Sequence, residues 1–483
     1  MTFLTVQRIL GALLSMFSLT MLPPIAVALL FQDPTWSVFL ASFGIVLAGG
    51  LALWWPVRKR RRDLRIRDGF LVVALFWVVL GLFGAVPLLL VDSPALSFSD
   101  AVFESIAGLT TTGTTVLSGV EFLPTSIQYY RHQLQWFGGL GIVVLAVAVL
   151  PMLGVGGMQL YRAELPGPVK DTKLTPRIMQ TAKALWYVYF GMTVACAAAY
   201  WLAGMSVFDA ICHSFSTVSI GGYSTHDASL GYFDSVLIEA IAIFFMFLAG
   251  ANFSLHFLVW RERSLRTYFA DPEFKAYFWI LVSLSAIVVG YLIVAGYYES
   301  VSEALRKGVF QAVSIATTTG YMTDAYALWP GGLPVLLILA SFIGGCGGST
   351  AGGIKVMRWL LMYKQGAREF QRLVHPNAEI AVKLGGKVVP PRVVDSVWGF
   401  FAVYVVVFVI LMLIMLTTGM DQVSAFAAMA ATLNNLGAGL GEVTTNFGTV
   451  TAVGKWASVC AMLLGRLEIF ALLVLITPTF WRG

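Results

Sequence analysis

Four short stretches of the sequence place a glycine beside small or hydroxyl-bearing residues. They read "FESIAGLTTTGTT" (103–115), "CHSFSTVSIGGYST" (212–225), "FQAVSIATTTGYMT" (310–323) and "AAMAATLNNLGAGLG" (427–441). Glycine lets the backbone turn its carbonyl oxygens in directions that other residues resist, and converging carbonyl oxygens can replace the hydration shell of a cation. One pattern that recurs four times therefore predicts a cation site built from backbone carbonyls.

The four stretches are spaced like copies of one unit. Alignment on Gly113, Gly222, Gly320 and Gly437 gives separations of 109, 98 and 117 residues, which leave room for two membrane helices and a short segment between them. Small residues also let membrane helices pack closely, and for a single copy that explanation is equally good. Four copies at matched positions favour the ion site.

Each stretch begins with about ten residues of modest apolarity, the length of a re-entrant half-helix. Asp100 and Asp209 stand 13 residues before the aligned glycine, where an N-cap is expected and where an acid complements the positive helix end. The half-helices should therefore start near the outer face and point their negative ends into the membrane. Irregular backbone at that depth must be buried in protein or line a water-filled cavity.

The composition is that of an integral membrane protein, with 58% hydrophobic and 12% charged residues in a chain of 483. The sequence predicts ten crossings, at the apolar runs 9–31, 37–57, 70–91, 133–153, 184–204, 236–260, 276–296, 333–343 (interrupted), 397–418 and 457–478. Arg8 stands directly before the first run within a long apolar stretch, and no convincing small-residue cleavage site follows, so the run is interpreted as a membrane helix and not as a signal peptide.

Cations set the expected orientation. Segment 58–67 holds seven Lys or Arg and segment 91–130 holds none, so the first is expected in the cytoplasm and the second outside. Both termini are then cytoplasmic. The net charge of +6 follows from this topology and does not indicate nucleic acid.

Other kinds of site find no support in the sequence. The four cysteines lie far apart without metal-ligand spacing, which indicates neither disulfides nor zinc. The five histidines show no spacing typical of metal ligands or of a catalytic group; they are His132, His213, His226, His256 and His375. No catalytic arrangement stands out, so no enzyme is predicted.

A glycine-rich segment, "GGCGGSTAGG" (344–353), interrupts the predicted second helix of the third copy. Its six glycines are Gly344, Gly345, Gly347, Gly348, Gly352 and Gly353. Each glycine costs about 1 kcal/mol in a helix relative to alanine, so the helix should break here. Close helix packing through small residues is the alternative, and the segment lacks the Gly-Lys-Ser/Thr of a nucleotide-binding loop.

Arg466, in "LLGRLEIF", falls within the last apolar run. An arginine at mid-membrane costs about 2.5–3.5 kcal/mol on insertion scales, so its side chain must face protein or water. Glu468, two positions on, should point elsewhere on the helix. From the residues alone, the interpretation is a buried arginine whose guanidinium is satisfied by loop carbonyls.

Several long strings resemble one family of transporters, among them "LQWFGGLGIVVLAVAVLPMLGVGGMQLYRAE" (134–164), "IGGYSTHDAS" (220–229), "IGGCGGSTAGGIKV" (343–356), "LVHPNA" (373–378) and "TPTFWR" (477–482). The chain resembles the Trk/Ktr/HKT superfamily of potassium transporters, most closely its bacterial TrkH branch. The resemblance implies an all-α membrane fold with two N-terminal transmembrane helices and four helix–pore loop–helix repeats of pseudo-fourfold symmetry, in a homodimer. The implied division is 1–68 for the N-terminal helices, then 69–165, 166–266, 267–380 and 381–483 for the four repeats.

The resemblance also implies where ions bind. The implied potassium selectivity filter consists of Thr111, Thr112, Gly113, Ile220, Gly221, Gly222, Thr318, Thr319, Gly320, Asn435, Leu436 and Gly437, with K⁺ at its centre. The fourth copy reads "NNLGAG", so Gly437 and Gly439 compete for the last position. The 344–353 loop would be a gate beneath the filter, and Arg466 would face the pore below it.

Potassium uptake across the bacterial inner membrane is the function that the resemblance implies, with rubidium as an analogue and no covalently bound cofactor. It also implies a cytoplasmic regulatory subunit of TrkA type that binds NAD or ATP, and the basic residues Arg358, Lys364 and Arg368 are expected to contact it. Two alternatives are a symporter that couples potassium to protons or sodium, and a membrane enzyme. An enzyme would need clustered His, Asp or Glu at a membrane face, which the sequence lacks.

Overall fold

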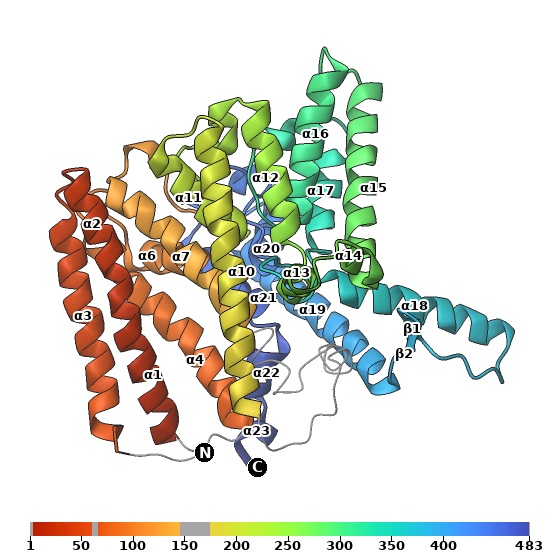
Figure 1. The fold of residues 1–483 in the computed structure, drawn as a ribbon, viewed down its shortest axis with the longest axis horizontal. Helices are drawn as coiled ribbons and strands as arrows, with labels where there is room; N and C mark the ends of the chain where they lie inside the picture. The colour runs from red at the N-terminus through yellow and green to blue at the C-terminus, as the bar shows by residue number, and fades with distance from the viewer. Residues whose placement is uncertain (1–2, 60–65, 145–173, 483) are drawn as a thin grey trace.

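The structure, a computed structural model, describes residues 3–59, 66–144 and 174–482, and the described chain is predominantly helical (Figure 1). It begins with α1 (Phe3–Ser18), η1 (Leu19–Met21), α2 (Leu22–Leu30), α3 (Trp36–Trp54) and η2 (Trp55–Val57). Helices α1 and α3 run side by side at one edge of the molecule. A methyl group placed on Gly11 would lie 2.6 Å from Trp54 N, so the two helices approach closely because this residue has no side chain.

A long helix, a short helix and another helix then recur four times, and these groups are called units 1 to 4. The long first helices are α4 (Ile66–Gly84, extended by α5, Val86–Leu90), α10 (Leu174–Leu202), α15 (Pro272–Val294) and α19 (Pro391–Thr417). The short helices are α6 (Phe98–Leu109), α11 (Val207–Val218), α16 (Val301–Ala316) and α20 (Gln422–Leu433). The helices after them are α7 (Thr125–Val144), α12 (Val236–Ala249) with α13 (Phe253–Glu262), α17 (Leu333–Ser341) with α18 (Val356–Val374), and α21 (Ala452–Arg466) with α22 (Phe470–Ile476) and α23 (Pro478–Arg482). The short elements α14 (Arg266–Ala270), η3 (Val120–Phe122), η5 (Ser229–Phe233), η6 (Tyr326–Leu328) and η7 (Gly441–Val443) lie in connections.

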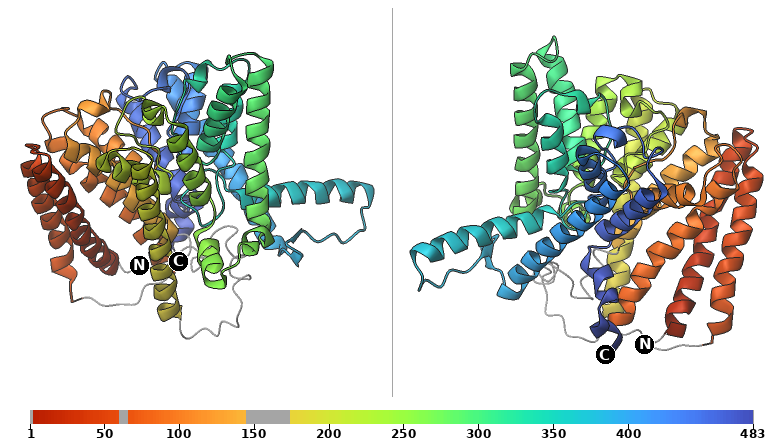
Figure 2. Two further views of the ribbon diagram at one scale, coloured as in Figure 1. Left: turned by 45° about the horizontal axis from the view of Figure 1, so that its top comes forward. Right: turned by 180° about the vertical axis from the view of Figure 1, so that it is seen from behind.

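Among the described residues, six helical stretches are long and apolar enough to cross a membrane. They are Phe3–Leu30, Trp36–Val57, Asp68–Leu90, Ala182–Leu202, Pro272–Val294 and Pro391–Thr417, and the pair α12 and α13, bent by 95°, qualifies only if it counts as one span. The predicted run 133–153 is described only to Val144, and the runs 333–343 and 457–478 correspond to shorter helices. The count of ten crossings stays a prediction. Both ends of the chain lie at the same end of the molecule (Figure 2).

The short helices start with caps, but the expected cap residues are wrong. In units 1 and 2 the N-caps are Ser97 and Ser206, whose hydroxyls accept hydrogen bonds from the backbone N–H groups of Asp100 and Asp209 at 3.2 and 3.0 Å. The aspartates stand at the third helical position and accept from the serine hydroxyls in return, both at 2.7 Å. Each serine and its aspartate thus exchange two hydrogen bonds, and both residue types are suited to the helix start.

The predicted helix break in unit 3 is confirmed. Helix α17 ends at Ser341, residues 342–355 form no regular helix, and α18 begins at Val356 and extends away from the bundle (Figure 1). Beyond it, β1 (Lys383–Leu384) pairs antiparallel with β2 (Lys387–Val388). Gly385 and Gly386 join the strands at φ values of 55° and 81°, because a two-residue turn of this type needs positive φ at both positions. The sequence analysis did not foresee this hairpin.

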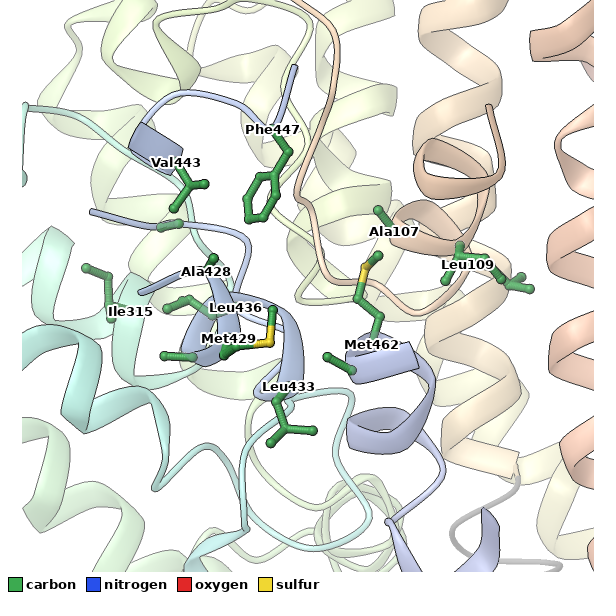
Figure 3. Close-up of a cluster of buried hydrophobic side chains, with 14 of the residues drawn as sticks. Ala107, Leu109, Ile315, Ala428, Met429, Leu433, Leu436, Val443, Phe447 and Met462 are labelled. Atoms are coloured by element: carbon green, nitrogen blue, oxygen red, sulfur yellow. The ribbon is translucent and has the colours of Figure 1, made fainter. Parts of the chain in front are cut away.

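Buried apolar side chains fix the inner ends of the short helices. Ala107 and Leu109 of α6, Ile315 of α16, Ala428 of α20 and Met462 of α21 belong to one cluster, and each is at most 3% exposed (Figure 3). Close-packed interiors of this kind resist displacement. The segments that follow α6, α16 and α20 are therefore supported by one dense core.

Candidate functional site

Each short helix ends in the same backbone turn. In unit 1 the N–H of Thr111 bonds to Gly108 O at 2.9 Å and the N–H of Thr112 bonds to Ala107 O at 2.9 Å, which together form a Schellman cap. The other three units repeat both bonds at the matching residues. The residues with left-handed φ at the turn are Thr111 (50°), Ile220 (55°), Thr318 (66°) and Asn435 (53°).

Three of these four residues are β-branched, a side-chain type that is a real outlier at positive φ. Backbone strain of this kind costs of order 1–3 kcal/mol per residue and persists only where the surroundings enforce it, commonly at functional sites. The sequence analysis placed these residues in the filter without predicting their conformation. The left-handed conformation recurs in all four units and is strained in units 1, 2 and 3, so it is a regular feature of the site.

The four aligned glycines complete the turn with positive φ of their own, at 79° for Gly113, 74° for Gly222, 81° for Gly320 and 86° for Gly437. A methyl group placed on each would meet a carbonyl oxygen of the next unit. The distances are 2.0 Å from Gly113 to Gly221 O, 1.9 Å from Gly222 to Thr319 O, 2.1 Å from Gly320 to Leu436 O and 2.5 Å from Gly437 to Thr112 O. Glycine is required at each position because of the positive φ and because a side chain would clash with the neighbouring carbonyl oxygen.

These contacts close on themselves in the order of units 1, 2, 3, 4 and back to 1. We call the four glycines and the residues directly before them, Thr112, Gly221, Thr319 and Leu436, the glycine ring. The ring takes in Gly437 and leaves out Gly439, because a methyl group on Gly439 would instead meet Val443 O of its own unit at 2.6 Å. The tertiary structure thereby separates two glycines that the sequence left as equals.

A cavity of about 220 Å³ opens on one side of the ring, and all four ring glycines line it. Arg131 and Tyr223 also line it, and the Arg131 guanidinium lies 4.2 Å from the centre of the Tyr223 ring. Arg131 Nε donates to Glu104 Oε1 at 2.7 Å, and both side chains are at most 2% exposed. Glu104 Oε2 also accepts from the N–H of Val116 at 3.1 Å, so this buried ion pair braces the segment that follows the ring in unit 1.

The glycine-rich loop 344–353 lies on the other side, against the ends of the short helices. The N–H of Gly352 donates to Thr318 Oγ1 at 2.7 Å, the N–H of Gly353 donates to Asn434 O at 3.0 Å, and Thr350 Oγ1 donates to Val218 O at 3.0 Å. A methyl group on Gly352 would lie 1.8 Å from Asn434 O. The loop thus contacts units 2, 3 and 4 next to the ring.

Arg466 connects this loop to unit 1. Its Nη1 donates to Thr350 O at 3.0 Å and its Nη2 donates to Thr111 Oγ1 at 2.5 Å, and the residue is 6% exposed. Together with Gly352 and Gly353 it lines a small cavity of about 30 Å³ under the ring. Both interpretations from the sequence are compatible with this position: a loop carbonyl accepts from the arginine, and its charge lies beside the ring.

Glu468 lines the same small cavity as Arg466 but forms its ion pair with Arg358, at 2.5 Å. Arg358 is 5% exposed, and its guanidinium stacks on the Phe400 ring at 4.0 Å. The expectation that Arg358 contacts a separate subunit is therefore wrong, because a carboxylate and an aromatic ring within the chain already cover it. Lys364 and Arg368, further along α18, are partly exposed.

Glu273, at the start of α15, is a loop contact that the sequence analysis missed. Its Oε1 accepts from the N–H of Gly347 at 2.7 Å and from the N–H of Met357 at 3.1 Å, and the residue is 2% exposed. One carboxylate thereby holds both the loop and the first turn of α18. The sequence carried one signal of this residue, an acid directly after an Asp-Pro helix start. That pattern is found at many capped helices and does not by itself indicate a contact with the loop.

Metal sites of the usual side-chain type are not found in the described ranges, which contain no cluster of three or more His, Cys, Asp or Glu able to hold an ion. His132 and His213 are buried and bond to the hydroxyls of Ser216 and Ser224 at 2.7 and 2.9 Å. Both rings thus have hydrogen-bond partners within the protein. The ring of backbone oxygens remains the candidate ion site.

The fold and the site define a polytopic helical membrane protein whose four units converge on one ring of backbone carbonyls. The TrkH family, described as a cation transport protein, matches residues 36–482. The chain belongs to this family.

Curated relatives match over their full length. The chain is 55% identical over 485 residues to "Trk system potassium uptake protein TrkH" of Vibrio parahaemolyticus, with both chains completely covered, and 54% identical to the protein of the same name from Escherichia coli strain K12, also completely covered. It is 43% identical to "Trk system potassium uptake protein TrkG" of the same strain, over 99% of this chain and 98% of the relative. The crystal structure of the potassium transporter TrkH from Vibrio parahaemolyticus matches with a TM-score of 0.94 at 52% identity and covers all of both chains.

Proposed function

We propose that this chain takes up potassium through a gated pore whose selectivity filter is the glycine ring. The observation that carries the proposal is the closed cycle in which each ring glycine abuts a carbonyl oxygen of the next unit. The relatives named as potassium uptake proteins support the choice of ion.

The ring suits a dehydrated monovalent cation. Four short helices end at it, and each C-terminal end carries about half a negative charge. The carbonyls of Thr112, Gly221, Thr319 and Leu436 would take the place of water around potassium or rubidium. No covalently bound cofactor has a role in this mechanism, since backbone oxygens supply the ligands.

The loop 344–353 is proposed as the gate. It lies under the ring and is held by a few hydrogen bonds, to which Arg466 and Glu273 contribute. A bistable element of this kind is shifted by a partner that binds one arrangement better than the other. A cytoplasmic NAD- or ATP-binding subunit of TrkA type, acting through Lys364 and Arg368 of α18, is the proposed regulator.

The proposal includes a homodimer in the bacterial inner membrane, with ten crossings and both termini in the cytoplasm. The segments rich in Lys and Arg, 58–67 and the end of α18, support the orientation because cytoplasmic flanks carry such an excess.

Reconstitution into liposomes tests the function. The purified chain should carry rubidium, and its reversal potential should follow the potassium gradient alone under imposed pH and sodium gradients. A reversal potential that moves with either of those gradients would identify a potassium symporter instead. If the reconstituted protein carries no potassium-dependent flux, whether as a pore or as a symporter, the proposal is refuted.

A further inference from the structure

The glycine ring is not the same in all four units. The residue directly before the ring glycine carries a side chain in units 1, 3 and 4, where it is Thr112, Thr319 and Leu436, but in unit 2 it is Gly221. In units 1 and 3 that threonine hydroxyl pairs with the hydroxyl two residues earlier, Thr112 with Thr110 at 2.7 Å and Thr319 with Thr317 at 2.8 Å. Unit 2 lacks this brace within its own segment.

Gln135 of α7 fills the vacant place from the neighbouring unit. A methyl group placed on Gly221 would lie 2.3 Å from Gln135 Cδ, and the three nearest atoms all belong to that side chain. Gln135 is 0% exposed. A residue with a side chain would not fit at position 221, because Gln135 of unit 1 occupies that space.

The amide of Gln135 binds the ring segment at two points. Its Nε2 donates to Gly221 O at 2.7 Å, and its Oε1 accepts from the N–H of Tyr223 at 3.3 Å. The second bond fixes the orientation of the amide, because a backbone N–H can only donate and must face the amide oxygen. The NH₂ group is thereby directed at the Gly221 carbonyl.

Gly221 O is a ring oxygen, the one that abuts Gly113. In the part of the chain that the structure describes, no hydrogen bond reaches the matching oxygens of Thr112, Thr319 or Leu436. Only one of the four carbonyls is thus already engaged by a donor. A carbonyl that accepts such a bond has less lone-pair density to offer a cation.

We propose that Gln135 is a positioning residue that determines ion selectivity, because it replaces the missing side chain of unit 2 and holds the Gly221 carbonyl at the ring. This inference rests on the proposed function, since it assigns a role within that filter. It makes the fourfold ring unequal: within the described residues three of the carbonyls accept no hydrogen bond, whereas the Gly221 carbonyl is shared between the ion and an amide from α7.

The test compares potassium and sodium permeabilities of reconstituted variants from their reversal potentials. Gln135→Met keeps the volume and removes both hydrogen bonds, so the ratio of potassium to sodium permeability should fall at least about fivefold, the factor that corresponds to losing one of them. The double variant Gln135→Ala with Gly221→Thr should restore most of the ratio. It recreates the threonine brace of units 1 and 3, with Ser219 as the partner two residues earlier.

Gln133→Met is the matched control. Gln133 lies on the same helix, is 2% exposed, and donates from Nε2 to Thr20 O at 2.7 Å, away from the ring. Its substitution should leave the permeability ratio unchanged.

Three results overturn the inference: an unchanged ratio in folded Gln135→Met, an equal fall in Gln133→Met, or a double variant that folds but does not recover selectivity. If Gln135→Met does not fold, the double variant alone decides. Failure of the unmodified protein to carry potassium is a different result, because it removes the proposed function itself.

Discussion

Arg466 and Thr111 are 355 residues apart in the sequence, and Arg466 Nη2 donates a hydrogen bond of 2.5 Å to Thr111 Oγ1. The same guanidinium donates through Nη1 to Thr350 O in the glycine-rich loop. One side chain therefore joins the strained turn of unit 1 to the proposed gate and places a positive charge directly beneath the ring. This arrangement gives Arg466 two separable effects, one from its charge and one from its hydrogen bonds.

Arg466→Ala should raise potassium flux about tenfold, because it removes a repelling charge and hydrogen bonds to the loop that are worth about 1.5–3 kcal/mol for a charged donor. Arg466→Lys keeps the charge and should give an intermediate flux. Rubidium uptake into liposomes measures both, with the exposed Arg261 replaced by Ala as the control. A flux in folded Arg466→Ala equal to that of the unmodified chain would leave this residue a structural role only.

Gly320→Ser should lower the preference for potassium over sodium about tenfold or abolish conduction. A side chain at this position would meet Leu436 O at 2.1 Å and would have to adopt a φ of 81°, so the ring must open. Gly113→Ser should act in the same way. Reversal potentials in mixed potassium and sodium give the ratio, and Gly290→Ser is the control because nothing lies within 4 Å of a methyl group there. Unaltered ratios in both ring variants would remove these glycines from the filter.

Gly352→Ala should produce a leak that does not depend on the proposed regulatory subunit, while the ion preference stays the same. The added methyl group would lie 1.8 Å from Asn434 O, so the loop must move away from unit 4. Flux measured with and without the cytoplasmic subunit tests this, and Gly366→Ala on α18, where a methyl group meets nothing, serves as the control. Regulation that survives in a folded Gly352→Ala protein would mean that the loop is packing material and that control lies elsewhere.

Asp100→Asn should lower stability by about 0.5–1 kcal/mol at neutral pH, as expected for a partly exposed ion pair. Lys455 Nζ lies 2.6 Å from Asp100 Oδ1 and thereby joins α6 to α21. Burial acts to raise the pKa of Asp100, but the hydrogen bonds from Lys455 and Ser97 outweigh it and bring the pKa below its ordinary value of 3.8.

Because the pKa is lowered in the folded state, this contribution is fully present above pH 3.8 and is lost as the pH falls through the lower folded value. Thermal unfolding of the detergent-solubilised protein across acidic pH measures it. The difference between the unmodified chain and Asp100→Asn should shrink toward zero in that range. A difference that stays constant at all pH values would show that the charge of Asp100 does not contribute.

The sequence by itself determined the local features. Gly113, Gly222, Gly320 and Gly437 could be aligned, and the break at 344–353 could be predicted, because glycine acts on the backbone of its own segment. The helix starts were also found, although Asp100 was taken for the cap that Ser97 provides. Both residue types favour a helix start, and the choice between them depends on a turn geometry that residue types alone do not specify.

Only the tertiary structure decided the contacts between units. Closure of the ring, the choice of Gly437 over Gly439, the pairing of Arg358 with Glu468 and the place of Gln135 at Gly221 all join segments that are tens to hundreds of residues apart. Such contacts depend on how each helix is rotated and how deeply it is inserted, and packing against many neighbours at once fixes both. The sequence supplied the groups that can bind an ion, and the packing of four units around one axis decided which of their oxygens meet.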